Sequence, residues 1–380
     1  MRVKLDKVCK RIYAGGDVPK DRYSTVKTAE CAIPIYANAE KDNGLYGYTD
    51  TARENELSIT VAARGTIGFT AIRREPFLPV VRLITVVPDL STVSERYLYY
   101  ALRNCKPASS GTSIPQLTVP DIKKNEIELY SLSVQETIAD KLDAVGRVIE
   151  LRQQQLQKLD ELVKARFVEM FGDPERNPKK WPVVSITEII RGKVSNGFFA
   201  KRDAYRNDGN VQVLGVANIV NRMYSNIEGL PRTNATQAEK EKYRVKYGDM
   251  LFCRSSLVAE GIGKASIVPQ DTPQNVLFEC HVIRLPLDQQ KCVPEFVQAL
   301  STTPYFRKQI IAQSKTATMT TIGQDGILKA AIILPPVELQ QEFLRFVEQT
   351  DKSKVAVQKA LDEAQLLFDS LMQKYFGDGN

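Results

Sequence analysis

The chain has 380 residues, a formal net charge of +7, 43% hydrophobic and 26% charged residues. This length suits about two domains of ordinary size, and the composition excludes extensive disorder. No apolar run approaches the roughly 20 residues of a membrane-spanning helix, and the basic start "MRVKLDKVCKRIYAGG" lacks the apolar stretch of a signal peptide. We expect a cytoplasmic protein without a membrane partner, whose positive charge permits a polyanionic partner without requiring one.

The first globular region, residues 1–131, is predicted to be rich in short β-strands. Strand-like runs cover 57–63 and 80–87, and a helical pattern covers 94–104. A hydroxyl-rich stretch, "PASSGTSIPQLTV", then leads toward a long helix. Hydroxyls and a glycine backbone suit phosphate contacts, and Arg can read base edges. The candidate nucleic-acid contacts of this region are Arg64, Ser110, Gly111 and Thr112.

A long amphipathic helix is predicted over residues 132–173. Its apolar residues recur at alternating steps of four and three, which is the heptad seam of a coiled coil. The predicted seam residues are Ile138, Leu142, Val145, Ile149, Leu156, Leu159 and Val163. Gly172 is expected to form a left-handed C-cap, and Pro174 prevents continuation. Such a helix spans on the order of 55 Å, which is too long for an ordinary globular domain.

The second globular region, residues 174–335, has a similar β-rich pattern. Strand-like runs cover 211–216, 250–255 and 278–285, the last with clean alternation, and a helical pattern covers 294–311. A second hydroxyl-rich stretch, "QSKTATMTTIGQ", matches the first in position. The candidate nucleic-acid contacts are Asn196, Lys201 and Arg202 in a polar loop, Arg254 and Ser255 after a strand-like run, and Lys315 and Thr316 in the hydroxyl-rich stretch.

The last segment, residues 336–380, is predicted to form a second long helix. Its seam is interrupted at Thr350 and Lys354, and Gly377 is the expected left-handed C-cap. The predicted seam residues are Phe343, Val347, Val357, Leu361, Ala364, Phe368 and Leu371.

The chain carries an internal repeat. A shift of 205 positions places Gln135 on Gln340 and the "FGD" that ends the first helix on the "FGD" that ends the second. The helices agree closely, whereas the globular regions share only faint identity. We therefore predict an α+β fold with a pseudo-twofold internal repeat. In it, two globular α/β domains are joined by two long helices that form an antiparallel coiled coil.

The residues indicate no active site. The six cysteines form no C-x-x-C pair, and His281 alone gives no zinc-finger spacing, so we expect free, mostly buried thiols, no metal and no cofactor. The stretch "AEGIGKAS" lacks the first glycine and the hydroxyl of a phosphate-binding loop. We interpret His281, inside a strand-like run, as a core or groove residue and not as part of a Ser-His-Asp site. No catalytic residues are predicted.

The whole chain resembles the specificity (S) subunit of type I DNA restriction-modification systems. The resemblance rests on two helical blocks, which begin "SLSVQETIADKLDAVGRVIEL" and "LPPVELQQEFLRFVEQT", and on the two-region, two-helix layout. Pro336, Gln340 and Gln341 follow the family pattern. The first block departs from it, because "YSL" stands where a proline is usual.

This resemblance implies a non-catalytic DNA-binding subunit. Residues 1–131 and 174–335 would be two target recognition domains, each reading one half of a bipartite site in double-stranded DNA. The helices at 132–173 and 336–380 would set the spacer between the half-sites and dock two methyltransferase (M) subunits. A restriction (R) subunit would join that complex.

The residues alone leave one alternative open, a coiled-coil scaffold that presents two protein-binding domains without DNA specificity. The two hypotheses differ in salt dependence, since phosphate contacts make affinity for DNA fall steeply with salt.

Overall fold

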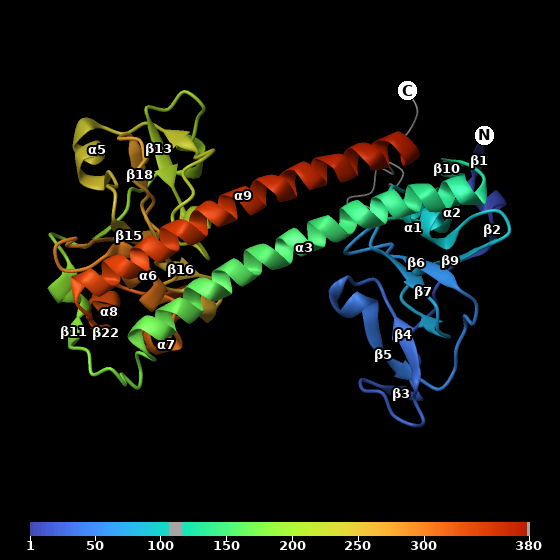
Figure 1. The fold of residues 1–380 in the computed structure, drawn as a ribbon, viewed down its shortest axis with the longest axis horizontal. Coiled ribbons are helices and arrows are strands. Elements are labelled where there is room, and N and C mark those ends of the chain that lie inside the picture. The colour runs from blue at the N-terminus through green and yellow to red at the C-terminus, as the bar shows by residue number, and fades with distance from the viewer. Residues whose placement is uncertain (106–115, 378–380) are drawn as a thin grey trace. The chain divides into compact units, whose positions relative to one another are not determined.

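The computed structural model describes residues 1–105 and 116–377, so the predicted contacts Ser110, Gly111 and Thr112 lie outside the described residues. By its internal packing the chain divides into two units. Unit 1 is Met1–Gln154 together with the chain from Val357 onward, and unit 2 is Gln155–Ala356. The two long helices, α3 (Leu132–Phe171) and α9 (Val337–Phe376), each contribute one part to each unit (Figure 1).

Unit 1 is built on an antiparallel sheet in the order β2-β9-β6-β7, against which α1 packs. A second sheet, β3-β5-β4-β8, contains one parallel pair, β4 with β8, and β1 pairs with β10. The strands β6 and β9 consist mostly of buried β-branched residues, which favour a pleated, packed surface. The bounds are β1 (Arg2–Lys4), β2 (Cys9–Ala14), β3 (Tyr23–Ser24), β4 (Ile33–Tyr36), β5 (Leu45–Thr49), β6 (Ser58–Val61), β7 (Thr70–Arg73), β8 (Leu78–Pro79), β9 (Ile84–Pro88), α1 (Glu95–Arg103), α2 (Val119–Lys124) and β10 (Glu126–Glu128).

Unit 2 repeats this topology. Its main antiparallel sheet has the order β12-β19-β15-β17, a second sheet β14-β13-β18 contains the parallel pair β13 with β18, and β11 pairs with β22. A further small sheet has the order β16-β21-β20. The bounds are β11 (Val183–Ser185), β12 (Ser195–Asn196), β13 (Val211–Leu214), α4 (Val216–Ile219), β14 (Arg232–Thr233), α5 (Gln237–Tyr243), β15 (Asp249–Cys253), β16 (Ser255–Ser256), β17 (Ala265–Ile267), β18 (Val276–Phe278), β19 (Val282–Pro286), α6 (Pro294–Ser301), α7 (Pro304–Ala312), β20 (Lys315–Thr316), β21 (Thr320–Thr321), α8 (Gln324–Leu328) and β22 (Ala331–Ile333).

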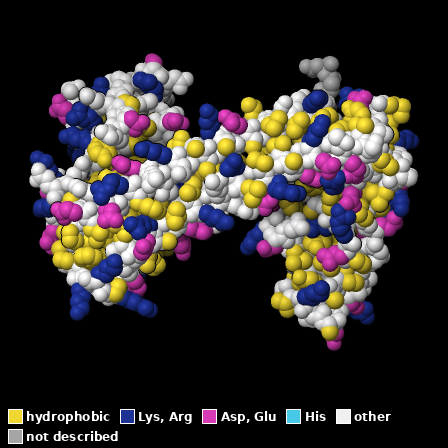
Figure 2. Space-filling view, in the orientation of Figure 1, with side chains coloured by type: hydrophobic (Ala, Val, Ile, Leu, Met, Phe, Trp, Pro, Cys, Tyr) yellow, Lys and Arg dark blue, Asp and Glu magenta, His cyan; other side chains and the backbone are white. Residues whose placement is uncertain are grey.

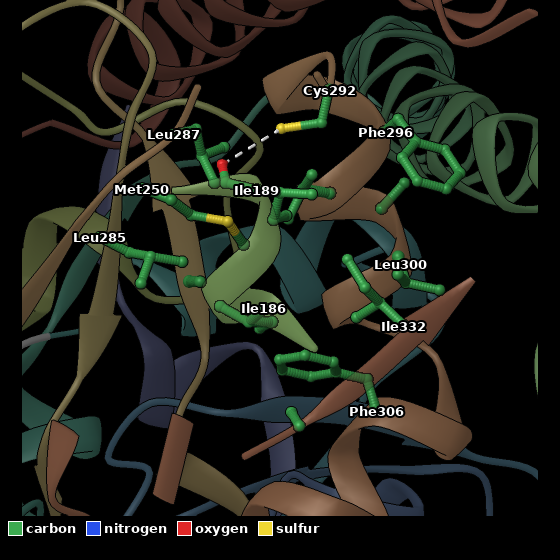
Figure 3. Close-up of a cluster of buried hydrophobic side chains, with 14 of the residues drawn as sticks. Ile186, Ile189, Met250, Leu285, Leu287, Cys292, Phe296, Leu300, Phe306 and Ile332 are labelled. Carbon is green, nitrogen blue, oxygen red and sulfur yellow. Dashed lines mark hydrogen bonds between the residues drawn. The ribbon is translucent and has the colours of Figure 1, made fainter. Parts of the chain in front are cut away.

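The core of unit 2 gathers side chains from its main sheet, from α6 and α7, and from the short helical turn at Ile186–Ile189 (Figure 3). Phe296 and Phe306 are almost completely buried there. Burying one such side chain stabilises the fold by roughly 2–3 kcal/mol. The thiol of Cys292 lies in this core, 3.8 Å from the carbonyl oxygen of Ile189. All six cysteines are free and four are buried, as predicted.

Within each unit α3 and α9 run antiparallel, as predicted. In unit 1 the first part of α3 packs on the last part of α9, where Leu142 shares a core with Phe368. In unit 2 the last part of α3 packs on the first part of α9, where the rings of Phe167 and Phe343 lie 5.8 Å apart. The periodicity did not pick out Phe167, although it is buried.

The residues of the predicted seam are buried or half-buried. Six of its residues are buried, namely Ile138, Leu142, Val163, Phe343, Val347 and Val357. The others are half-buried: Val145, Ile149, Leu156, Leu159, Leu361, Ala364, Phe368 and Leu371. At the interruption, Thr350 is buried and its hydroxyl donates to the carbonyl of Phe346. Lys354 Nζ lies 2.8 Å from Asp160 of α3, so a polar pair replaces the apolar contact.

The "FGD" motifs end the long helices inside a core. Phe171 packs on Phe296 with ring centroids 4.8 Å apart, and Phe376 packs on Tyr97 at 4.9 Å. Gly172 adopts the predicted left-handed conformation, with φ +80°. The same prediction for Gly377 is wrong. Its N–H donates to the carbonyl of Gln373, which continues the helical pattern.

Two predicted strands are interrupted by turns. The run 80–87 contains a turn at 80–83, closed by the N–H of Leu83 on the carbonyl of Val80, before β9 begins. The run 278–285 contains the equivalent turn at 279–282 before β19. Because apolar residues flank both turns, the sequence pattern there looked like an uninterrupted strand.

Candidate nucleic-acid interface

The small sheet β16-β21-β20 brings predicted contacts of unit 2 together. Ser255 and Lys315 both pair with Thr321 of the middle strand, and Thr316 pairs with Thr320. The hydroxyls of Thr316 and Thr320 lie 3.0 Å apart. Lys315 and Thr316 are exposed. The ammonium group of Lys315 therefore lies in one row with the hydroxyls of Ser255 and Thr321, a combination suited to phosphate, whereas Thr316 lies in the next row beside the buried Thr320.

Arg254 joins this sheet to the turn before β19. Its backbone N–H donates to the carbonyl of His281 at 2.8 Å, and its Nη1 donates to the carbonyl of Cys280 at 3.2 Å. The ring Nδ1 of His281 lies 3.2 Å from the hydroxyl of Ser255. His281 itself is exposed. Of the two interpretations offered for it, the core position is wrong, because the residue lies in a turn rather than in a strand.

The remaining predictions of unit 2 lie along one segment. Asn196 is half-buried in β12 and pairs with Ile283 of β19. Lys201 and Arg202 are exposed at the short helical turn Arg202–Ala204. The pairing of β16 and β20 with β21 brings together Arg254, Ser255, Lys315 and Thr316. Lys201 and Arg202 lie at a turn that is not part of this sheet.

In unit 1 the described candidate is Arg64. It is exposed, and its Nε and Nη2 both donate to Oε1 of Gln116, at 3.0 and 2.7 Å. The preceding residue, Ala63, donates its backbone N–H to the side chain of Asn38 at 2.7 Å. The same Asn38 donates from Nδ2 to the carbonyl of Val81. One amide thus fixes Arg64 next to the turn at 80–83.

Several other arginines of unit 1 already have partners. Arg11, Arg22 and Arg74 form ion pairs with carboxylates. Arg73 is buried, with its guanidinium 3.6 Å from the ring centre of Tyr36, and burial lowers its pKa. On the face drawn in Figure 2, cationic and acidic side chains are interspersed in each unit.

Arg82 is the cation that the sequence pattern missed. It is exposed, it follows Val81 in the turn, and it forms no ion pair within the described residues. Its position in the sequence could have revealed it. An Arg that stands between apolar residues of a strand-like run cannot be buried in the same core as those residues.

Ser255, His281 and two cysteines are described residues near this sheet whose side chains are of catalytic types. Ser255 and His281 are in contact, but no described carboxylate bonds to the imidazole, so they form no triad. Burial raises the pKa of the Cys253 and Cys280 thiols, which disfavours a nucleophilic thiolate. No cluster suited to a metal ion occurs among residues 1–105 and 116–377. Over the same residues, no helix is long and apolar enough to cross a membrane.

A family model described as "Type I restriction modification DNA specificity domain" matches residues 1–161 and 178–364. The MjaIX specificity subunit of a type I restriction enzyme from Methanocaldococcus jannaschii is 25% identical over 96% of this chain and 88% of its own length. The EcoKI specificity subunit of Escherichia coli is 25% identical over 70% of this chain and 60% of its own length. Two Mycoplasma pneumoniae relatives, 34% and 37% identical, are matched over about half of their length, 46% and 48%.

Solved structures share the fold. A type I restriction-modification S subunit from M. genitalium matches 100% of this chain and 96% of its own, with TM-score 0.57 and 14% identity. A chain from work on complex assembly and conformational transition of the type I R-M system matches 99% of this chain and 97% of its own, with TM-score 0.58 and 16% identity. The α+β fold built from two similar halves is therefore confirmed.

Proposed function

Because the chain belongs to the family of type I restriction modification DNA specificity domains, we propose that it is the non-catalytic DNA sequence-specificity subunit of a type I restriction-modification complex. One observation carries this proposal. Two units of the same topology each expose polar and cationic side chains next to a turn at the same place, before β9 and before β19. Two similar supports with different side chains suit two different half-sites in one DNA duplex.

The proposed division of roles follows the repeat. Residues 1–131 and 174–335 act as target recognition domains, each for one half of a bipartite site in double-stranded DNA. Residues 132–173 and 336–380 dock two methyltransferase subunits and set the spacer between half-sites. A restriction subunit completes the cleaving form of the complex. The names of the relatives, specificity subunits of type I restriction enzymes, support this assignment.

The proposed DNA contacts fall into two classes. Lys315 and Ser255 are suited to phosphate, because they place an ammonium group and a hydroxyl in one row of a small sheet, and the exposed Thr316 is proposed as a second phosphate contact. Arg64 is suited to base edges, since its side chain is exposed and the backbone of the preceding Ala63 is held by Asn38. The further proposed contacts are Ser110, Gly111, Thr112, Asn196, Lys201, Arg202 and Arg254.

The test is methylation mapping by long-read sequencing in a host that co-expresses this chain with its methyltransferase. We expect methylation at a split motif, with two short specified halves around an unspecified gap, that disappears when the chain is deleted. Exchange of residues 1–131 for the corresponding region of a relative should change one half only. Methylation that persists unchanged on deletion, with no methyltransferase co-purifying, would overturn the proposal.

A further inference from the structure

The two units contain a turn at the same place in the topology, although its sequence and backbone conformation differ: Val81 and Arg82 have positive φ, whereas Cys280 and His281 do not. In unit 1 the N–H of Leu83 closes the turn on the carbonyl of Val80, and in unit 2 the N–H of Val282 closes it on Glu279. Each turn follows a strand that pairs in parallel with its neighbour, namely β8 or β18. It leads into an inner strand of the main sheet, β9 or β19. The two middle positions are Val81-Arg82 in unit 1 and Cys280-His281 in unit 2.

A glycine of a neighbouring strand or loop packs closely against the backbone of each turn. The N–H of Gly15 donates to the carbonyl of Leu83, and that of Gly197 donates to the carbonyl of Val282. A Cβ on Gly15 would lie 2.6 Å from the carbonyl carbon of Pro79, and one on Gly197 would lie 2.2 Å from the carbonyl oxygen of Glu279. Only glycine allows this approach, so both units hold their turn in the same place.

A polar side chain also donates a hydrogen bond to a backbone carbonyl of each turn. In unit 1 Asn38 donates to the carbonyl of Val81, and in unit 2 Nη1 of Arg254 donates to the equivalent carbonyl, that of Cys280. Each of these two side chains is also linked to a proposed DNA contact. Asn38 also binds the residue before Arg64, and Arg254 is itself followed by Ser255.

The middle residues point outward from this rigid support. The residues that close the turns, Leu83 and Val282, are buried, whereas Arg82 and His281 are exposed. Val81 and Arg82 have φ of +51° and +62°, a left-handed conformation that is costly for a β-branched residue. A held backbone that carries exposed polar side chains is the arrangement that reading a base requires, since a misplaced donor cannot discriminate.

We propose that Arg82 and His281 are equivalent base-reading residues, one for each half of the bipartite site. This inference rests on the proposed function. The guanidinium of Arg82 has the forked donors that fit N7 and O6 of guanine in the major groove. Nδ1 of His281 faces the hydroxyl of Ser255, which leaves Nε2 to meet a base edge. The identity of these two residues sets part of each half-site.

The experiment uses the full chain co-expressed with its methyltransferase and compares methylation at every single-base variant of the motif. The variants are Arg82→Ala, Arg82→Lys, His281→Ala and His281→Gln. Lys124→Ala and Lys329→Ala serve as controls, because these exposed lysines lie at matching places in α2 and just after α8, and neither belongs to a turn. Arg82→Ala should reduce discrimination at a position in one half by roughly 5- to 150-fold, and His281→Ala should do so in the other half.

The half that each variant does not touch reports on folding and assembly, because it should be read as in the wild type. If Arg82→Ala abolishes methylation altogether, Arg82→Lys decides, since it keeps the charge but loses the fork. A relaxed motif with Arg82→Lys supports the inference, and an unchanged motif overturns it. Unchanged motifs with both alanine variants also overturn it. A wild type without any split motif would instead overturn the proposed function.

Discussion

The side-chain oxygen of Gln340 accepts a hydrogen bond from the backbone N–H of Val293 at 2.8 Å. The equivalent residue of the repeat, Gln135, accepts one from the N–H of Ser94, also at 2.8 Å. Val293 and Ser94 are the N-cap residues of α6 and α1. One buried amide at the start of each long helix thus satisfies a backbone donor at the start of α1 or α6 in the neighbouring globular domain. This explains why the repeat keeps a glutamine at both positions.

Replacing Gln340 with leucine should lower the free energy of unfolding of unit 2 by about 1–3 kcal/mol. Gln340 is fully buried, so the N–H of Val293 would remain buried without a partner. The matched control is Gln341→Leu, because Gln341 is exposed on the same turn of α9. Thermal unfolding of both variants provides the measurement. Equal midpoints for the two variants would contradict the role given to this hydrogen bond.

The last turn of α9 should stabilise unit 1. Phe376 is buried against Tyr97, and the amide of Asn104 donates to its carbonyl at 2.6 Å. Phe376→Ala should therefore cost about 3 kcal/mol, which is typical for removing a buried aromatic ring. Hydrogen exchange should accelerate in β6 and β9 while β15 and β19 keep their protection. Leu366→Ala, at an exposed site of α9, should change neither. Loss of protection in unit 2 alone would refute this packing.

The sequence predicted what periodicity and internal repetition can encode. The heptad stripe located α3 and α9, and the repeated "FGD" located their ends. It did not separate the two turns from the strands, because Val80, Leu83 and Val282 continue the apolar pattern while the chain reverses. The same turns carry Arg82 and His281, so the error in secondary structure and the omission of Arg82 from the candidate site have one cause. Likewise, the sequence could not predict that Arg254 and Ser255 lie close to Lys315 and Thr316. They are brought together by the pairing of β16 and β20 with β21, which no local sequence pattern indicates.

Asp249 should make the stability of unit 2 depend on pH. Burial raises its pKa to about 6 from an ordinary value of 3.8, although the N–H of Lys246 donates to it at 2.9 Å. Because the folded-state pKa is the higher one, the protonated acid favours the folded state. Its contribution is complete below about pH 3.8 and is lost as the pH rises through about 6.

The variant Asp249→Asn removes this titration but keeps an acceptor for the N–H of Lys246. Its free energy of unfolding relative to the wild type should rise by about 2 kcal/mol between pH 4 and pH 7. Urea unfolding at a series of pH values tests this. Asp271→Asn, at an exposed position, should run parallel to the wild type. A constant difference between Asp249→Asn and the wild type across this range would show that the carboxyl group does not titrate as described.

Lys315 should contribute affinity for DNA without contributing sequence preference. Its ammonium group is exposed on β20 and forms no ion pair within the described residues, so it is free to neutralise a phosphate. Removing one phosphate contact lowers the slope of log affinity against log salt by about one. In the complex assembled with its methyltransferase, Lys315→Ala should therefore bind all duplexes more weakly at low salt and keep its preference among half-site variants. Fluorescence anisotropy at several salt concentrations measures both quantities, with Lys329→Ala as the control of equal charge. A changed preference with an unchanged slope would assign Lys315 to a base edge instead of a phosphate.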